Sequence, residues 1–340
     1  MAKFDFKSNF GKSLTIIICL VFSHFSFVTA QDVEFSQFYA NPLYLNPALA
    51  GTGECNRVIL NYRNQWPSIE KGFVTYSASA DFFVDALSGG LGIVAYSDDA
   101  AGLINTFRVS GIYSYHLKLS ESARLNAGIE ASYHRQQLKW NNLVFPDMID
   151  FNTGAINPSN SSEPVVDNDL VNVADFSSGL VLGIKKTYYV GIAAHHLSQP
   201  KIAYYNNSEN NRLFLKYTVH GGAYIKIKDS YFESGNGSMY ISPNILYQRQ
   251  LNAQQLNAGL SVNYYPLSAG VWYRHNFSNP DAIVFLLGII QKRFKFGYSY
   301  DTSLSNLKGA SGGAHEVSVG LLIMCSGKRK RPGAIKCPEF

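Results

Sequence analysis

Charged residues are scarce in this chain of 340 residues: Asp, Glu, Lys and Arg together make up 16%, against roughly 25% in soluble domains. After residues 1–30 no apolar run approaches the roughly 20 residues that a membrane-spanning helix needs. The four cysteines and eight histidines show no Cys-x-x-Cys or His-x-x-His spacing, so nothing supports a structural zinc site. The net charge of +5 is too small to indicate a nucleic-acid partner.

Aromatic residues are abundant at 14%, and the chain has 28 glycines. The mean hydropathy is nevertheless only −0.06. In a transmembrane β-barrel, lipid-facing and lumen-facing residues alternate along each strand, so apolar and polar contributions cancel in the average. The composition therefore predicts an all-β, outer-membrane type of antiparallel barrel.

Residues 1–30 have the pattern of a cleaved signal peptide. Lys3, Lys7 and Lys12 form a basic start, an apolar run covers 14–22, and Ala30 follows a small residue two positions earlier. The run is too short for a membrane anchor. We expect export through a signal peptide and a mature chain that begins at Gln31.

Residues 31–56 are predicted to be non-strand, because two Asn-Pro pairs interrupt them and proline cannot donate to a ladder. Their many Phe, Tyr and Leu side chains must pack against something. We expect a periplasmic segment or a plug in the barrel lumen. At the other end of the chain, 326–340 is predicted to be a basic periplasmic tail.

From Arg57 onward the sequence alternates apolar and polar residues between turn signals, as in 107–117, 256–264, 294–301 and 316–323. The barrel region 57–325 is thus expected to hold about fourteen strands, an even number being usual. Long outer loops are expected at 139–175, 198–211 and 302–313, with both chain ends on the periplasmic side. A soluble sandwich would also alternate, but its apolar face would hold more Val, Ile and Leu and fewer Tyr and Phe. The predicted strands are 57–65, 73–82, 90–97, 104–117, 122–138, 176–186, 188–197, 212–228, 239–249, 255–264, 269–276, 282–292, 293–301 and 314–325.

Catalytic and metal-binding patterns are weak. His195 and His196 would point to opposite faces of a strand and could not share one metal ion. The Gly-x-Ser-x-Gly pattern at 309–313 precedes a predicted strand rather than a helix, so it is not a nucleophile elbow, and we expect no enzyme and no cofactor. Acidic residues on the predicted outer loops suggest solvated charge rather than a calcium site. These are Asp98, Asp99, Asp147, Asp150, Asp167, Asp169 and Asp175.

The mature chain keeps Cys55, Cys325 and Cys337, and its predicted compartment permits disulfides. Alternation directs Cys325 outward and Cys55 inward. We therefore favour a Cys55–Cys337 disulfide over Cys55–Cys325, with one thiol left unpaired.

Several blocks of sequence resemble the PorP/SprF family. The first spans 35–51, the second is Tyr62-Arg63-Asn64-Gln65-Trp66-Pro67, and the third runs from Tyr300 to Ser318, followed by a tail ending in Cys-Pro-Glu-Phe. No motif matches within 139–255. The positions that carry the resemblance are Asn41, Pro42, Asn46, Pro47, Arg63, Gln65, Trp66, Gly313, His315 and Glu316.

This resemblance implies an outer-membrane component of the type IX secretion system of Bacteroidota, and in some members a role in gliding motility. Expected partners are membrane lipid, other secretion components and an adhesin-like secreted protein whose C-terminal domain is bound. No catalytic residue or cofactor carries over. The alternative function is an outer-membrane channel for small, possibly hydrophobic solutes. A channel requires a continuous lumen with an apolar pocket and a movable plug, whereas the secretion role requires a blocked lumen and protein-binding loops.

Overall fold

In the computed structural model, the residues whose structure is described are 32–53, 55–185, 187–205, 211–228, 238–277, 279–291, 293–304 and 311–324. The predicted signal peptide and basic tail lie outside these ranges, as do Cys325 and Cys337. No helix among the described residues is long and apolar enough to cross a membrane.

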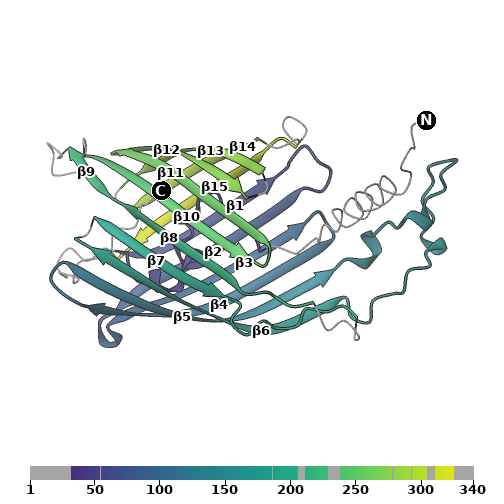
Figure 1. Cartoon of the computed structure of the whole chain (residues 1–340), viewed down its shortest axis with the longest axis horizontal. Coiled ribbons are helices and arrows are strands. Elements are labelled where there is room, and N and C mark those ends of the chain that lie inside the picture. Colours follow the sequence, from purple (N-terminus) through teal and green to yellow (C-terminus); the bar gives the residue numbers. More distant parts are fainter. Residues whose placement is uncertain are drawn as a thin grey trace, which may run out of the picture. The chain divides into compact units, whose positions relative to one another are not determined.

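A single antiparallel sheet closes on itself to form a barrel (Figure 1). β1 pairs with β15, and β10 pairs with β11, which closes the ring. The described residues form fifteen strands, but β8 and β9 follow each other directly and both pair with β10, so the barrel has fourteen strands as predicted. The strands are β1 (Asn56–Gln65), β2 (Phe73–Val84), β3 (Gly89–Ala100), β4 (Ile104–Lys118), β5 (Ala123–Leu138), β6 (Leu170–Ile184), β7 (Tyr188–His195), β8 (Lys216–Ala223), β9 (Ile225–Lys228), β10 (Met239–Gln250), β11 (Ala253–Tyr264), β12 (Leu267–Asn276), β13 (Asn279–Ile290), β14 (Phe294–Ser303) and β15 (Ala314–Ile323).

The barrel is apolar outside and polar inside. On β4, Phe107 and Tyr115 are exposed, whereas Arg108, Ser110 and Ser114 are buried. A soluble sandwich would bury its apolar face, so this distribution excludes that alternative and confirms the membrane-type barrel. Other exposed outward side chains include Leu60, Tyr76, Ile93, Ile129, Phe176, Ile192, Tyr217, Ile245, Phe285 and Leu287.

The two ends of the barrel differ in their connections. We call the end where β1 begins and β15 ends the turn end; short connections there include 85–88, 119–122, 185–187 and 265–266. The opposite end, the loop end, carries the long connection 139–169 between β5 and β6. This loop is shorter than the predicted 139–175, because β6 already begins at Leu170. Short turns inside and long loops outside are usual for bacterial barrels, which predicts that the loop end faces the cell exterior.

Residues 33–52, which we call the plug segment, lie within the barrel and contain the short helices η1 (Phe38–Ala40), α2 (Pro42–Leu45) and η2 (Pro47–Leu49). The segment runs the length of the lumen. Gln37 bonds to Glu316 and Ser299 near the loop end, and Gly51 bonds to Asp81 near the turn end. β1 therefore starts at the turn end as predicted, whereas the described chain before it begins at the loop end.

Candidate functional site: the plugged lumen

Asn46 fixes the middle of the plug segment. Its side chain is fully buried, and Oδ1 accepts a hydrogen bond from the Ala48 backbone N–H (2.9 Å), which caps η2. Its Nδ2 donates to the carbonyl oxygens of Leu180 (3.3 Å) and Ile192 (3.0 Å) on β6 and β7, and lies 3.1 Å from Nε2 of His220 on β8. One amide thus joins the plug segment to three neighbouring strands.

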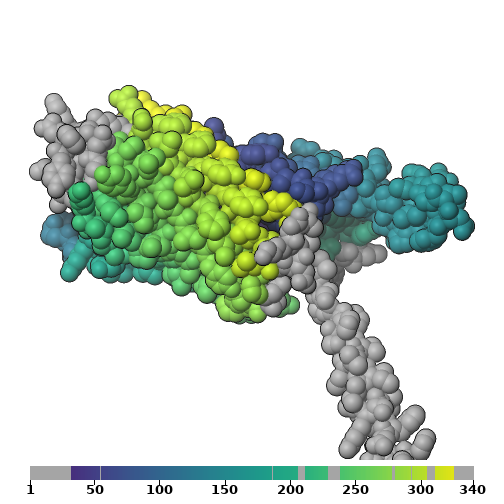
Figure 2. Space-filling view, turned by 90° about the horizontal axis from the view of Figure 1, so that it is seen from above, coloured from purple at the N-terminus to yellow at the C-terminus, as the bar shows by residue number. Residues whose placement is uncertain are grey.

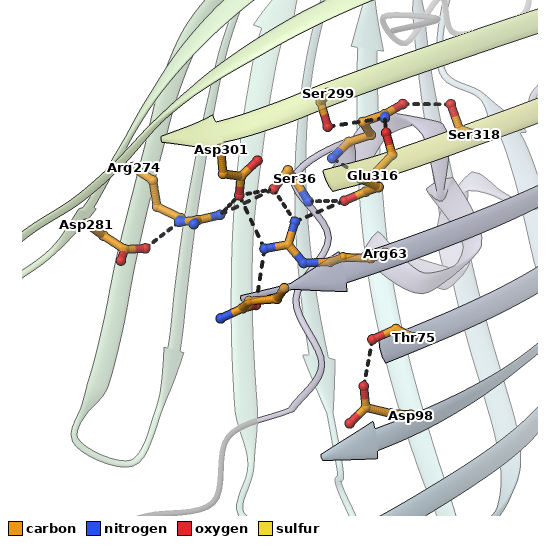
Figure 3. A network of polar contacts seen from close by, with 12 residues as sticks. Ser36, Arg63, Thr75, Asp98, Arg274, Asp281, Ser299, Asp301, Glu316 and Ser318 are labelled. Atoms are coloured by element: carbon orange, nitrogen blue, oxygen red, sulfur yellow. Dashed lines mark hydrogen bonds and ion pairs between the residues drawn. The ribbon is translucent and has the colours of Figure 1, made fainter. Parts of the chain in front are cut away.

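A buried charged cluster holds the plug segment at the loop end, as Figure 3 shows. The Ser36 backbone N–H donates to Glu316 (2.7 Å), and its hydroxyl donates to Asp301 (2.5 Å). Arg63 lies between these two carboxylates, at 3.2 Å from Asp301 and 3.3 Å from Glu316. Arg274 forms a further ion pair with Asp301 (2.9 Å). Charges of both signs therefore meet around the backbone of the plug segment.

Apolar packing fills the lumen between these polar anchors. Phe38, Tyr39, Leu45 and Leu49 of the plug segment share a buried cluster with inward-facing wall residues. Phe38 and Trp272 meet edge to face, with ring centroids 6.4 Å apart. Such an apolar core inside a polar lumen arises because the plug segment brings its own apolar surface. The wall residues of the cluster are Val181, Tyr189, Leu246, Trp272, Val284 and Leu286.

Glycines on the inner wall let the plug backbone approach closely. A Cβ atom on Gly128 of β5 would lie 2.3 Å from the Ala48 nitrogen, and one on Gly90 of β3 would lie 2.1 Å from the Ala50 carbonyl oxygen. Both contacts are with backbone, which cannot rotate away. The wall is therefore shaped for this segment.

A second buried charged cluster lies on the inner wall of the barrel. Arg108 of β4 pairs with Glu130 of β5 (3.0 Å) and with Asp175 of β6 (3.4 Å). Asp175 in turn lies 2.7 Å from His196 Nδ1 and accepts a hydrogen bond from Ser198 (2.7 Å). This cluster ties four successive elements of the wall together.

The family model described as "Type IX secretion system membrane protein PorP/SprF" matches residues 27–321, which covers the plug segment and almost the whole barrel. The chain belongs to the PorP/SprF family. No curated protein matches it.

Solved outer-membrane barrels resemble the PorP/SprF barrel in fold alone. Omp33 of Acinetobacter baumannii is 11% identical with a TM-score of 0.40, and the match covers 79% of this chain and 97% of that one. The toluene transporter TodX of Pseudomonas putida is 8% identical with a TM-score of 0.43, over 86% and 93%. BamA of Haemophilus ducreyi lacking POTRA domains 1–3 is 10% identical with a TM-score of 0.37, over 78% and 70%.

Most PorP/SprF motif positions contact the plug segment or belong to it. Asn41 donates to Ser77 (3.1 Å), and Pro42 and Pro47 open α2 and η2. Arg63 and Glu316 belong to the loop-end cluster, where Arg63 also donates to Gln65 (3.2 Å).

The remaining motif positions form the loop-end rim. Trp66 and Gly313 both have positive φ angles, of 61° and 70°, and the Trp66 N–H donates to the Gly313 carbonyl (2.8 Å). A Cβ on Gly313 would lie 2.2 Å from the Asp301 carbonyl oxygen, so this position requires glycine. His315 Nδ1 lies 2.8 Å from the Tyr298 hydroxyl on the outer face.

Two predictions about chemically active residues are wrong. His196 does not point away from His195: it follows the last residue of β7, adopts a positive φ of 61° and is buried in the lumen like its neighbour. Asp175 is not on an outer loop, because it is an inward residue of β6 and fully buried. Asp98 likewise lies within β3 and accepts a hydrogen bond from Thr75 (2.6 Å; Figure 3).

Among the described residues, no group of three or more His, Cys, Asp or Glu is placed to hold a metal ion. Cys55 is disulfide-bonded, and its partner falls outside the described ranges. Pairing with Cys337 therefore stays a prediction, which mass spectrometry of unreduced peptides checks. The Arg108 cluster was not predicted, although the inward position of Arg108 on its predicted strand was a usable signal.

Proposed function

We propose that this PorP/SprF protein is a non-enzymatic, non-conducting component of type IX secretion in the outer membrane. It binds the C-terminal domain of a secreted, adhesin-like protein at its loop end and secretion machinery at its turn end, and it takes part in gliding where the cell glides. The observation that carries this proposal is the anchored plug. A segment joined by buried hydrogen bonds to β2, to β6 and β7, and to β14 and β15 suits a closed support for other proteins.

The channel alternative is less well supported by the inner wall. A pathway for hydrophobic solutes needs an apolar pocket, whereas inward residues of β10 and β11 such as Ser242, Asn244, Ser261 and Asn263 are polar and buried. The apolar inward residues that exist, such as Trp272, pack against the plug segment. The outward apolar surface supports a partnership with membrane lipid.

Affinity purification of the tagged protein from its native cells in mild detergent tests this function. The proposal expects a secreted adhesin-like protein, periplasmic secretion components, or both to co-elute, with identification by mass spectrometry. The same preparation is inserted into planar lipid bilayers, where no steady ion current is expected. A barrel that elutes alone and conducts ions or takes up solutes contradicts the proposal and favours the channel.

A further inference from the structure

The connection between β5 and β6, residues 139–169, stands beyond the part of the barrel that faces lipid. We call it the arm. On β5 the exposed apolar residues end at Tyr133, and the next outward residue is the exposed Arg135. On β6 the corresponding boundary lies between Phe176 and the exposed polar Asn172. From Tyr133 to the start of the arm the strand covers roughly 20 Å, at about 3.3 Å per residue.

The base of the arm is fastened to the neighbouring turn. The Lys139 backbone N–H donates to the Leu103 carbonyl (2.8 Å), and its ammonium group pairs with Asp99 (2.7 Å). Asn142 donates to the Gly102 carbonyl (2.8 Å). Figure 2 shows the arm, in teal, standing clear of the barrel wall. Its apolar side chains are thus not part of the membrane-facing surface.

The arm has a defined internal structure. Ile149 and Ile156 form an antiparallel bridge, and the Asp150 N–H donates to the Ala155 carbonyl (2.9 Å), which makes a hairpin with Gly154 at a φ of 71°. The Asp147 carboxylate accepts hydrogen bonds from the Ser162 N–H (2.6 Å) and hydroxyl (2.8 Å). These bonds, the Ser162 backbone N–H first, lower the pKa of Asp147, so it stays ionised at neutral pH.

This preorganised arm exposes large apolar side chains to water. Phe151 at the hairpin is 83% exposed, Val165 is 71% exposed, and Ile156 and Val144 are at least half exposed. An aromatic side chain is a frequent anchor of a protein interface, because it buries a large area and has few rotatable bonds. Exposed apolar groups on an ordered loop therefore point to a binding partner.

The charge of the arm limits what that partner is. Its single basic residue, Lys139, is paired with Asp99, and its five acidic residues leave it strongly negative. An anionic lipid surface would repel the arm, and a second copy would present the same acidic arm. A protein with an apolar pocket bordered by Lys or Arg is complementary in both respects. The acidic residues are Asp147, Asp150, Glu163, Asp167 and Asp169.

We propose that the arm is the docking element for the secreted protein, with Phe151 seated in an apolar pocket of a folded domain whose rim is basic. This inference rests on the proposed function and names the part of the loop end that performs it. Asp150 and Glu163 face the basic rim, and the bonds within the arm hold the hairpin ready for contact.

The test uses the full-length tagged protein in its native cells. The secreted protein is first identified as one that is lost from the cell surface or medium when the gene is deleted. The amount that co-purifies with Phe151→Ser is then compared with wild type. The control is Phe277→Ser, an equal change at another exposed phenylalanine of the loop end. We expect about a tenfold or larger loss for Phe151→Ser, as for an interface anchor, and little loss for Phe277→Ser.

A photo-crosslinking residue in place of Phe151 identifies what the hairpin touches, and is expected to join to the same secreted protein. Glu163→Lys is expected to weaken capture at low salt and to differ less from wild type at high salt, since rim charges act through long-range attraction. Equal capture by Phe151→Ser and wild type, or crosslinks only to lipid, overturns the docking role while leaving the proposed function intact. If wild type itself captures no secreted protein, the proposed function fails instead.

Discussion

Replacing Gly128 with alanine would show whether the plug segment is a fixed part of the core. The new Cβ would lie 2.3 Å from the Ala48 nitrogen and 2.4 Å from the Pro47 carbonyl carbon. Because these are backbone atoms, either the plug segment or β5 must shift. Overpacking of this kind costs roughly 1–3 kcal/mol. With a urea dependence of about 2–3 kcal/mol per molar, the unfolding midpoint should fall by roughly 0.3–1.5 M.

Gly111→Ala is the matched control, because Gly111 lies on β4 next to β5 and a Cβ there meets nothing within 4 Å. This variant should be neutral or more stable by up to about 1 kcal/mol, since alanine loses less backbone entropy than glycine on folding. Both variants are unfolded in lipid vesicles, with tryptophan fluorescence as the signal. Equal midpoints for Gly128→Ala and Gly111→Ala would refute a tightly seated plug, because a loosely held segment would move aside at no cost.

Arg63→Met should destabilise the barrel by about 3–5 kcal/mol, since it leaves the buried Glu316 carboxylate without its cation. In urea unfolding, the double variant with Glu316→Gln should cost less than the sum of the two single variants. Strict additivity would contradict the pairing. A cysteine at Glu34 should react with a membrane-impermeant maleimide on intact cells, whereas a cysteine at Ser120, in a turn-end connection, should react only after permeabilisation. Labelling of the Ser120 cysteine but not the Glu34 cysteine on intact cells would contradict the path of the plug segment. Asp147→Ala should speed protease cleavage within the arm without changing barrel unfolding. Because the pKa of Asp147 is lowered, its contribution to the stability of the arm is present at neutral pH and should be lost only as the pH falls through that lowered value. A cleavage rate that does not change on substitution would contradict the folded arm.

The strands were largely predictable because lipid and lumen impose a two-residue alternation. The predicted strand 104–117 differs by one residue from Ile104–Lys118, since apolar and polar residues alternate over 107–117 except at Gly111 and Ile112. The start of β6 was missed by six residues. An aspartate at 175 was taken as a loop residue, whereas its charge is neutralised inside the barrel by Arg108.

The path of the plug segment was not predictable in the same way. Its Asn-Pro pairs indicate breaks in regular structure but not which wall groups they meet. Asn46 binds carbonyl oxygens more than 130 positions away along the chain, and no local pattern encodes such contacts. His196 illustrates the same limit, because a single left-handed residue after a strand end reverses the direction that alternation assigns.

Comparison of the secreted proteins of cells with and without this chain tests the central claim most directly. Quantitative mass spectrometry of the surface and medium should show that one or a few secreted proteins disappear and accumulate in the periplasm when the gene is deleted. Reintroducing the wild-type gene should restore them. An unchanged set of secreted proteins, together with lost uptake of a small solute, would contradict a role in protein secretion and support a channel.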